Sequence, residues 1–154
     1  MNIDKLKRFI PDALAARGRS KDRSTKVGAV ALDKDFVLKS SGYNGFPRGV
    51  DDTLDERHAR PLKYDWTLHA EMNVVAQAAR PVLEGTTVIV TSLHPCPICA
   101  GMLIQTGVVR VLAPRTEAVK RIEEGREDWD EKGAIAMQML AEAGVEVVYY
   151  DEES

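Results

Sequence analysis

Apolar positions recur along the chain with two alternating periods, one of about 3.6 residues and one of two, which predict helices and strands respectively. The first helical pattern runs from Ile3 to Leu14, and Pro11 inside it is expected to kink or split the helix. Two β-rich runs follow at 26–32 and 36–43, on either side of the residues DKD. This arrangement predicts an antiparallel hairpin near the N-terminus.

A long polar stretch separates the hairpin from an alternating second half. Residues 44–65 are charged and irregular, and a loop of this length in a compact domain is usually functional or disordered. The charged stretch 116–131 predicts either a helix or a solvated loop. Periodicity and turn residues predict helices at 68–80, 97–107 and 134–144, and strands at 86–92, 108–113 and 145–150.

The order of these elements predicts the fold class. A hairpin followed by alternating helices and strands indicates one α/β domain over residues 1–154, with a central mixed sheet of about five strands. Strands separated by helices are expected to be parallel neighbours, with helices covering both faces of the sheet. The chain is therefore expected to form a single three-layer α/β/α domain.

Composition narrows the classes of function. The chain has 154 residues, of which 44% are hydrophobic, enough for an ordinary buried core. It lacks an apolar run near the roughly 18 residues of a membrane span, and its N-terminus lacks the apolar region of a signal peptide. The net charge is −3 without a basic stripe, whereas proteins that track polynucleotides carry one. We therefore expect a cytoplasmic protein with a small-molecule substrate, and neither a polynucleotide nor a membrane as partner.

The candidate chemistry lies in two short motifs. Cys96 and Cys99, the two cysteines of the chain, form a CxxC between a predicted strand and a predicted helix, while His69 and Glu71 stand at the start of another helix. Two thiolates and His69 would give zinc three protein ligands and leave the fourth position for water, as in catalytic zinc sites. Glu71, beside the metal but not on it, suits a proton shuttle to and from that water. The combined pattern H-x-E…P-C-x-x-C is the signature of zinc nucleobase deaminases.

Two other interpretations of the same residues stay open from the sequence. A CxxC between a strand and a helix also fits a dithiol redox pair, although this leaves His69 and Glu71 unexplained. A structural zinc site would need a fourth ligand, and His94, two residues before Cys96, is the nearest candidate.

The sequence resembles the cytidine deaminase-like superfamily, and most closely its deoxycytidylate (dCMP) deaminases, over residues 18–110. Four segments carry the resemblance: RSKDRSTKVGAV, SGYNGFPRG, HAEMN and PCPICAGMLIQTGV. The last two are shared by the whole superfamily, and the first two are typical of its nucleotide-specific branch. The resemblance implies the cytidine deaminase-like fold, conversion of dCMP to dUMP and ammonia, and one Zn²⁺ per chain.

The resemblance also implies roles for individual residues. It makes His69, Cys96 and Cys99 the zinc ligands and Glu71 the proton shuttle. Because relatives assemble into multimers, the resemblance implies a homo-oligomer. Many relatives are regulated by dCTP and dTTP, and the sequence leaves open whether this chain is regulated in the same way.

Substrate contacts are implied in the same way. Asn44 is expected to bind the deoxyribose or orient the nucleotide, and Arg23 and Lys26 to receive the 5′-phosphate, which requires cationic donors. Two departures from the family pattern leave a nucleoside, a free base or a modified pyrimidine open as substrate. Residues 113–131, which follow the expected strand, contain no tyrosine, and Trp129 is the candidate aromatic wall there. His94 precedes the Pro-Cys, beside the expected base pocket.

Overall fold

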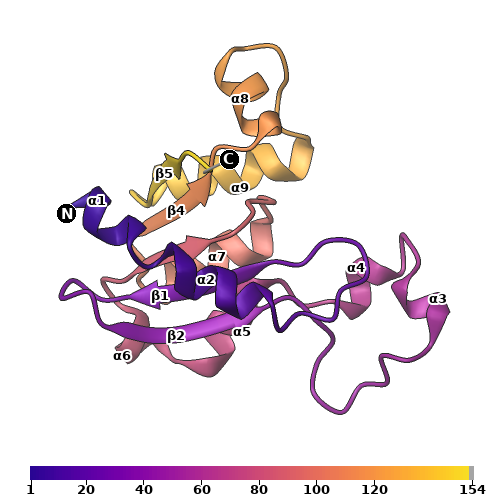
Figure 1. The fold of residues 1–154 in the computed structure, drawn as a ribbon. Coiled ribbons are helices and arrows are strands. Elements are labelled where there is room, and N and C mark those ends of the chain that lie inside the picture. The colour runs from indigo at the N-terminus through magenta and orange to yellow at the C-terminus, as the bar shows by residue number, and fades with distance from the viewer. Residues whose placement is uncertain (153–154) are drawn as a thin grey trace.

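The computed structural model describes residues 1–152, and its centre is a mixed sheet of five strands in the order β2-β1-β3-β4-β5 (Figure 1). The strands are β1 (Gly28–Leu32), β2 (Leu38–Tyr43), β3 (Thr87–Val90), β4 (Arg110–Pro114) and β5 (Glu146–Tyr150). The helices are α1 (Ile3–Lys7), α2 (Ile10–Arg17), α3 (Asp55–His58), α4 (Lys63–Trp66), α5 (Ala70–Gln77), α6 (Arg80–Leu83), α7 (Pro97–Gln105), α8 (Glu117–Glu123) and α9 (Glu131–Glu142).

The strand order corrects one expectation. β1 and β2 form the predicted antiparallel hairpin, and β3, β4 and β5 are parallel neighbours as predicted. However, β3 pairs antiparallel with β1 rather than parallel with β2. After the connection through α5, β3 does run parallel to β2, but β1 lies between these two strands and pairs with both. The expectation that strands separated by a helix are neighbours is therefore wrong at this one step.

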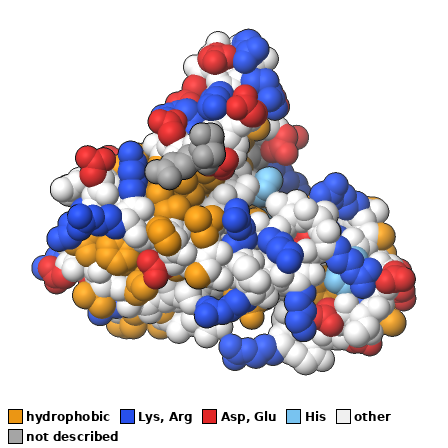
Figure 2. All heavy atoms as spheres, in the orientation of Figure 1, with side chains coloured by type: hydrophobic (Ala, Val, Ile, Leu, Met, Phe, Trp, Pro, Cys, Tyr) orange, Lys and Arg blue, Asp and Glu red, His pale blue; other side chains and the backbone are white. Residues whose placement is uncertain are grey.

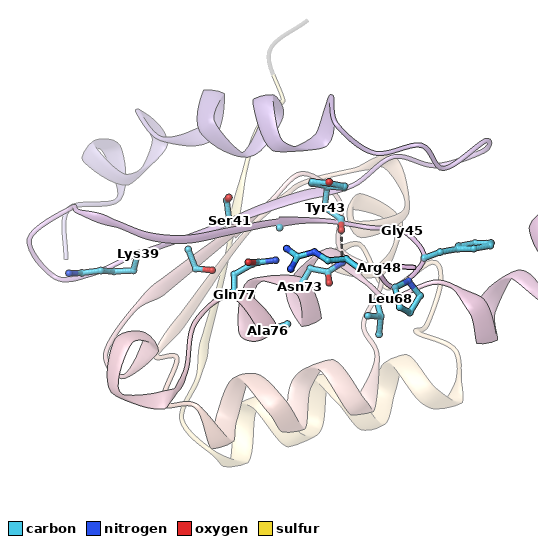
Figure 3. A pocket seen from close by; sticks show the side chains of 13 residues that line it. Lys39, Ser41, Tyr43, Gly45, Arg48, Leu68, Asn73, Ala76 and Gln77 are labelled. Atoms are coloured by element: carbon cyan, nitrogen blue, oxygen red, sulfur yellow. Dashed lines mark hydrogen bonds between the residues drawn. The ribbon is translucent and has the colours of Figure 1, made fainter. Parts of the chain in front are cut away.

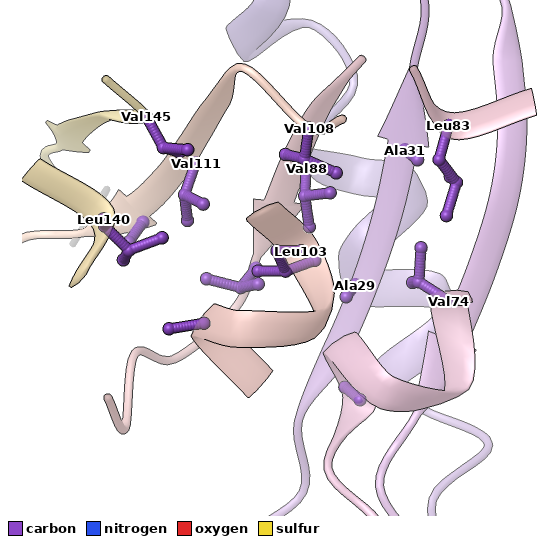
Figure 4. Packing of buried hydrophobic residues seen from close by; sticks show 14 of the residues in the cluster. Ala29, Ala31, Val74, Leu83, Val88, Leu103, Val108, Val111, Leu140 and Val145 are labelled. Carbon is purple, nitrogen blue, oxygen red and sulfur yellow. The ribbon is translucent and has the colours of Figure 1, made fainter. Parts of the chain in front are cut away.

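Alternating side chains of the strands build two cores, one on each face of the sheet, because successive residues of a strand point to opposite faces. Ala29 and Ala31 of β1 belong to the core under α5, α7 and α9, part of which is drawn in Figure 4. Val30 and Leu32 belong to the core under α1 and α2. The three-layer α/β/α fold is confirmed.

Several predicted boundaries move because proline takes the first turn of a new helix instead of ending an old one. The first helical pattern is split into α1 and α2, and Pro11 lies in the first turn of α2. The helix expected over 68–80 ends at Gln77, and Pro81 lies in the first turn of α6. Within residues 1–152 no helix combines the length and the apolar character that a membrane span needs.

Two polar segments acquire more structure than their sequences indicate. The 44–65 stretch carries the single-turn helices α3 and α4, and the ring of Phe46 stacks on the rings of His58 and Trp66, with centroids 4.9 and 6.3 Å apart. The charged stretch 116–131 forms α8 and a loop that project from the body as an arm (Figure 1). Figure 2 shows this arm covered with side chains of both charges, which fits a solvated helix.

Gly42 allows the helix that begins after His69 to lie directly on the sheet. A Cβ atom at Gly42 would stand 2.7 Å from the carbonyl oxygen of Ala70 and 2.7 Å from the backbone nitrogen of Val74. These distances are far below van der Waals contact, so only glycine permits this separation between β2 and α5. The start of α5 is thereby held at one edge of the sheet.

Candidate active site

The two predicted motifs meet where two helices begin. His69 is the N-cap residue of α5 and Cys96 is the N-cap residue of α7, and the two helices pack against each other on one face of the sheet. The side-chain donor atoms of His69, Cys96 and Cys99 all lie within 4.8 Å of one another. Nδ1 of His69 is 3.2 Å from Sγ of Cys99, so this ring nitrogen faces the thiols. We call these three residues the metal cluster.

The donor set of the metal cluster fits zinc. Ligand atoms at about 2.0–2.3 Å from a tetrahedral zinc lie roughly 3.5–3.8 Å from one another. The three donor atoms here all lie within 4.8 Å of one another, so a small movement of the side chains would bring them to these distances. Desolvation, with a smaller effect of His94, lowers the pKa of His69, so the imidazole is neutral and able to bind a metal. Burial raises the pKa of Cys99, and the charges of Glu71 and Cys96 raise it further. A coordinated cation reverses that preference, because a metal-bound thiol is deprotonated.

The metal cluster has three protein ligands rather than four. Among residues 1–152, no further histidine, cysteine or carboxylate joins the group, and the fourth-ligand candidate His94 is not part of it. Three protein ligands are typical of a catalytic zinc that keeps one position for water, whereas structural zinc is held by four. The structure therefore disfavours the structural zinc site.

Glu71 lies beside the metal cluster in the first turn of α5. Its residue is 9% exposed, and its carboxyl group is hydrogen-bonded to the thiol of Cys99. Burial raises the pKa of Glu71 to about 7, although the hydrogen bond to Cys99 opposes this effect. A cation bound close by would lower the pKa again, because it favours the carboxylate. The carboxyl group is thus placed to hold or release a proton next to the metal cluster.

A backbone bridge joins the metal cluster to the rest of the site. The amide of Gly45 donates to the carbonyl of Leu68 at 3.1 Å, and the amide of Leu68 donates to the carbonyl of Gly45 at 2.9 Å. This antiparallel bridge closes the 44–68 segment, which we call the closed loop. Asn44 precedes one end of the bridge and His69 follows the other, so the structure brings these two predicted residues together.

Asn44 holds the 20–27 loop in place beside the metal cluster. Its Oδ1 accepts hydrogen bonds from the hydroxyl of Ser20 and the amide of Val27, each at 2.8 Å, and its Nδ2 donates to the carbonyl of Thr25 at 2.8 Å. The residue is 7% exposed. Asn44 therefore acts on the 20–27 loop, a role that the sequence did not indicate, and within residues 1–152 its Nδ2 uses one of its two hydrogens. The sugar contact stays a prediction.

The two phosphate candidates differ in their surroundings. A guanidinium nitrogen of Arg23 lies 2.8 Å from Oδ1 of Asp55, so this side chain is already paired with the closed loop. Lys26 is exposed, and it forms no ion pair with any of residues 1–152. Both residues lie in the loop that Asn44 holds. Because Arg23 is already paired with Asp55 and Lys26 is exposed, Lys26 is the more available cation.

His94 and Trp129, the two unusual residues of the sequence, differ in position. Nε2 of His94 lies 3.1 Å from Oγ of Ser92, and desolvation followed by the charge of Lys63 lowers the pKa of His94. His94 in turn contributes to the lowered pKa of His69, so the charges of the two imidazoles interact. Trp129 lies against Gly133 at the start of α9. A place beside the substrate stays a prediction for both residues.

The sequence analysis missed a buried ion pair in the same region. Nζ of Lys63 lies 2.8 Å from Oδ1 of Asp22, and their side chains are only 11% and 6% exposed. The two residues are 41 positions apart in polar segments, and no local pattern distinguishes them from solvated charges.

A separate hollow of about 520 Å³ lies outside the metal cluster (Figure 3). It is bounded by β2, the first residues of the closed loop and the outer side of α5. Arg48 and Gln77 point polar groups toward it, whereas the ammonium of Lys39 points away and lies 3.4 Å from Oδ2 of Asp33. Nδ2 of Asn73 donates to the carbonyl of Tyr43 at 2.7 Å along its wall. None of the metal-cluster residues lines this hollow.

The family assignment follows from comparison with known proteins. The family model described as "Cytidine and deoxycytidylate deaminase zinc-binding region" matches residues 3–114, which is more than half of the chain. The chain belongs to this family. It is therefore a zinc-dependent hydrolytic deaminase, and zinc is the cofactor that the metal cluster fits. The match confirms the resemblance seen in the sequence and favours this activity over dithiol redox chemistry.

Individual relatives agree with the family assignment. "Uncharacterized deaminase in luxG 3'region" from Aliivibrio fischeri is 42% identical over 143 residues, which are 93% of this chain and 91% of that protein. A probable deoxycytidylate deaminase from Caenorhabditis elegans is 43% identical over 113 residues, 71% of this chain and 57% of the relative. The chain thus spans little more than half of the worm protein.

A solved structure shows the same fold. The crystal structure of dCMP deaminase from the cyanophage S-TIM5, in complex with dCMP and dUMP, superposes with a TM-score of 0.69 at 23% identity and covers 99% of both chains.

Proposed function

We propose that this chain converts dCMP and water to dUMP and ammonia. The observation that carries the proposal is the hydrogen-bonding of Asn44, which ties the cationic 20–27 loop to the edge of the metal cluster. A free base or a nucleoside carries no phosphate, so its deaminase has no need of cations in a loop beside the metal cluster. A 5′-phosphate does need such cations. The names of the worm relative and of the cyanophage structure support the same substrate.

The side chains divide the reaction between them. Zinc held by His69, Cys96 and Cys99 would lower the pKa of a water bound to it to about 7, so that hydroxide would be available at neutral pH. The carboxylate of Glu71 would take one proton from the attacking water as its oxygen bonds to C4 of cytosine, and would pass that proton to the ring nitrogen N3. It would then move the second proton from the new C4 hydroxyl to the amine, so that the C4–N bond breaks, ammonia leaves and C4 keeps the oxygen as a carbonyl.

The loops orient the nucleotide. The other Nδ2 hydrogen of Asn44 is offered to the sugar, and the cations of the 20–27 loop receive the phosphate. His94 forms part of the wall near the base. A homo-oligomeric state and control by dCTP or dTTP remain predictions from the resemblance, and a cytoplasmic location remains a prediction from the composition.

The test is a panel of substrates: cytosine, cytidine, deoxycytidine, CMP, dCMP and dCTP, with ammonia release measured for each. We expect the highest kcat/KM for dCMP and a clearly lower value for deoxycytidine. Equal kcat/KM values for deoxycytidine or cytosine and dCMP would contradict the nucleotide assignment and leave the same chemistry on another pyrimidine. Absence of ammonia from all six compounds would contradict pyrimidine deamination.

A further inference from the structure

Lys63 is a buried cation whose side-chain partners within residues 1–152 lie in the 20–27 loop. It is the first residue of α4 and is 9% exposed. Its Nζ lies 2.8 Å from Oδ1 of Asp22 and also donates to the hydroxyl of Ser24. Lysine is rarely buried to this extent unless it is paired, so the pair with Asp22 is the reason that Lys63 is tolerated there.

Asp22 links Lys63 to the backbone of the 20–27 loop. Its Oδ1 accepts hydrogen bonds from the amides of Ser24 and Thr25, both at 2.9 Å, so it fixes the turn formed by residues 22–25. Arg23 lies within that turn, and Lys26 follows it directly. The position of both phosphate candidates therefore depends on Asp22.

The 20–27 loop is thus held at two points. Asn44 holds it next to His69, and Lys63 holds it through Asp22 from a helix six positions before His69. Both holding residues belong to the closed loop, whose ends meet beside the metal cluster. The loop that carries the cations and the segment that carries His69 consequently form one hydrogen-bonded unit.

We propose that Lys63 is a positioning residue for the nucleotide phosphate: by holding Asp22 it sets the distance between the cations of the 20–27 loop and the metal cluster. Asp22 neutralises the charge of Lys63, so the ammonium acts through the loop and is not itself the phosphate ligand. The inference rests on the proposed function, because it presupposes a substrate that carries a phosphate.

Kinetics of a small set of variants tests this role. Lys63→Met removes the charge, Asp22→Asn keeps an oxygen for the turn but loses the ion pair, and the double variant leaves no buried charge uncompensated. Lys63→Arg is the conservative variant. Lys7→Met is the matched control, because Lys7 is 45% exposed and lies 3.8 Å from the carboxylate of Asp4 on α1, outside both loops. Zinc content and thermal unfolding are measured for each protein.

We expect Lys63→Met and Asp22→Asn to raise KM for dCMP about tenfold or more, as for loss of a charged contact, with kcat within a few-fold of native. Deoxycytidine kinetics should not change. The double variant should show no larger effect than either single variant, Lys63→Arg should restore most of the affinity, and Lys7→Met should behave as native. If a single variant does not fold, the double variant supplies the same comparison.

Five results would overturn the inference. Equal losses for dCMP and deoxycytidine would indicate a merely structural role, and unchanged KM would indicate no role. Additive effects of the two single changes would indicate that Lys63 contacts the phosphate itself. A native protein without preference for dCMP over deoxycytidine overturns the proposed function and this inference together, whereas a native preference that Lys63→Met leaves intact overturns the inference alone.

Discussion

The two halves of the site are held together by different forces. The metal cluster stands on α5 and α7, whose inner side chains Val74 and Leu103 are buried in an apolar core. The 20–27 loop and the closed loop are held mainly by polar contacts between residues far apart in the chain, such as Asn44 and Lys63. The metal cluster is therefore held by the core, whereas the loops that we propose to bind the substrate are held by a hydrogen-bonded network.

This difference has an energetic consequence. Moving α5 or α7 would open cavities in a close-packed core, at a cost of several kcal/mol. Moving the 20–27 loop breaks a few hydrogen bonds, each worth about 1 kcal/mol net. A fold of this kind can keep its metal chemistry while the loops change to suit another substrate.

The largest expected effect breaks the core-anchored half. Cys99→Ala removes one of three ligands and leaves His69 and Cys96, so we expect the protein to lose zinc and all measurable ammonia release. Elemental analysis of native and variant protein measures this directly, with about one zinc per chain expected in the native protein. Full retention of zinc by the variant, or its absence from the native protein, would exclude the metal cluster as the zinc site.

The next effect separates proton transfer from metal binding. Glu71→Gln keeps the size of the side chain but cannot take a proton, so kcat should fall by roughly 10²–10⁴ while zinc and fold are retained. The variant is assayed for ammonia release beside its zinc content. Activity within a few-fold of native would show that another group moves the proton.

A smaller effect belongs to the loops and sharpens the contrast. Lys26→Gln should lower kcat/KM for dCMP about ten- to hundredfold, because a charge-assisted contact is worth about 1.5–3 kcal/mol. Arg23→Gln should cost less, since Arg23 is already paired with Asp55. Deoxycytidine serves as the control substrate and should be unaffected by either change. The opposite order of the two variants would make Arg23 the phosphate ligand.

The same contrast explains what the sequence could predict. The metal cluster follows from two short motifs at helix starts, and the helices follow from periodicity, so His69, Cys96 and Cys99 could be brought together without a structure. The place of β3 beside β1 could not, because the order of elements does not say which strand already fills the neighbouring position. The buried position of Lys63 could not be predicted from the sequence either.

Long-range polar contacts are the general limit. The pair of Lys63 and Asp22 spans 41 positions, and each residue alone is typical of a solvated loop. Asn44 was expected at the site, but its contacts to the 20–27 loop depend on three backbone or hydroxyl groups that have no sequence signature. Apolar periodicity is a local signal, whereas these contacts exist only once the fold has formed.

The smallest predicted effect measures how far the polar network stabilises the fold. Burial opposes ionisation of Asp22, but hydrogen bonds from Lys63, Thr25 and Ser24 outweigh it and lower the pKa of Asp22 to about 2, from 3.8. A lowered pKa in the folded state stabilises the protein above about pH 4, and this contribution is lost as the pH falls toward 2.

The free energy of unfolding of native protein should therefore exceed that of the Asp22→Asn, Lys63→Met double variant. The excess should shrink by about 1 kcal/mol as the pH falls from about 4 to 2, after allowance for solvent screening. Urea unfolding at several pH values measures the difference, with Asp128→Asn, a change at an exposed carboxyl, as the control that should follow the native curve. A difference independent of pH would mean that the ion pair does not link the loops in solution, and the contrast between the two halves of the site would then rest on Asn44 alone.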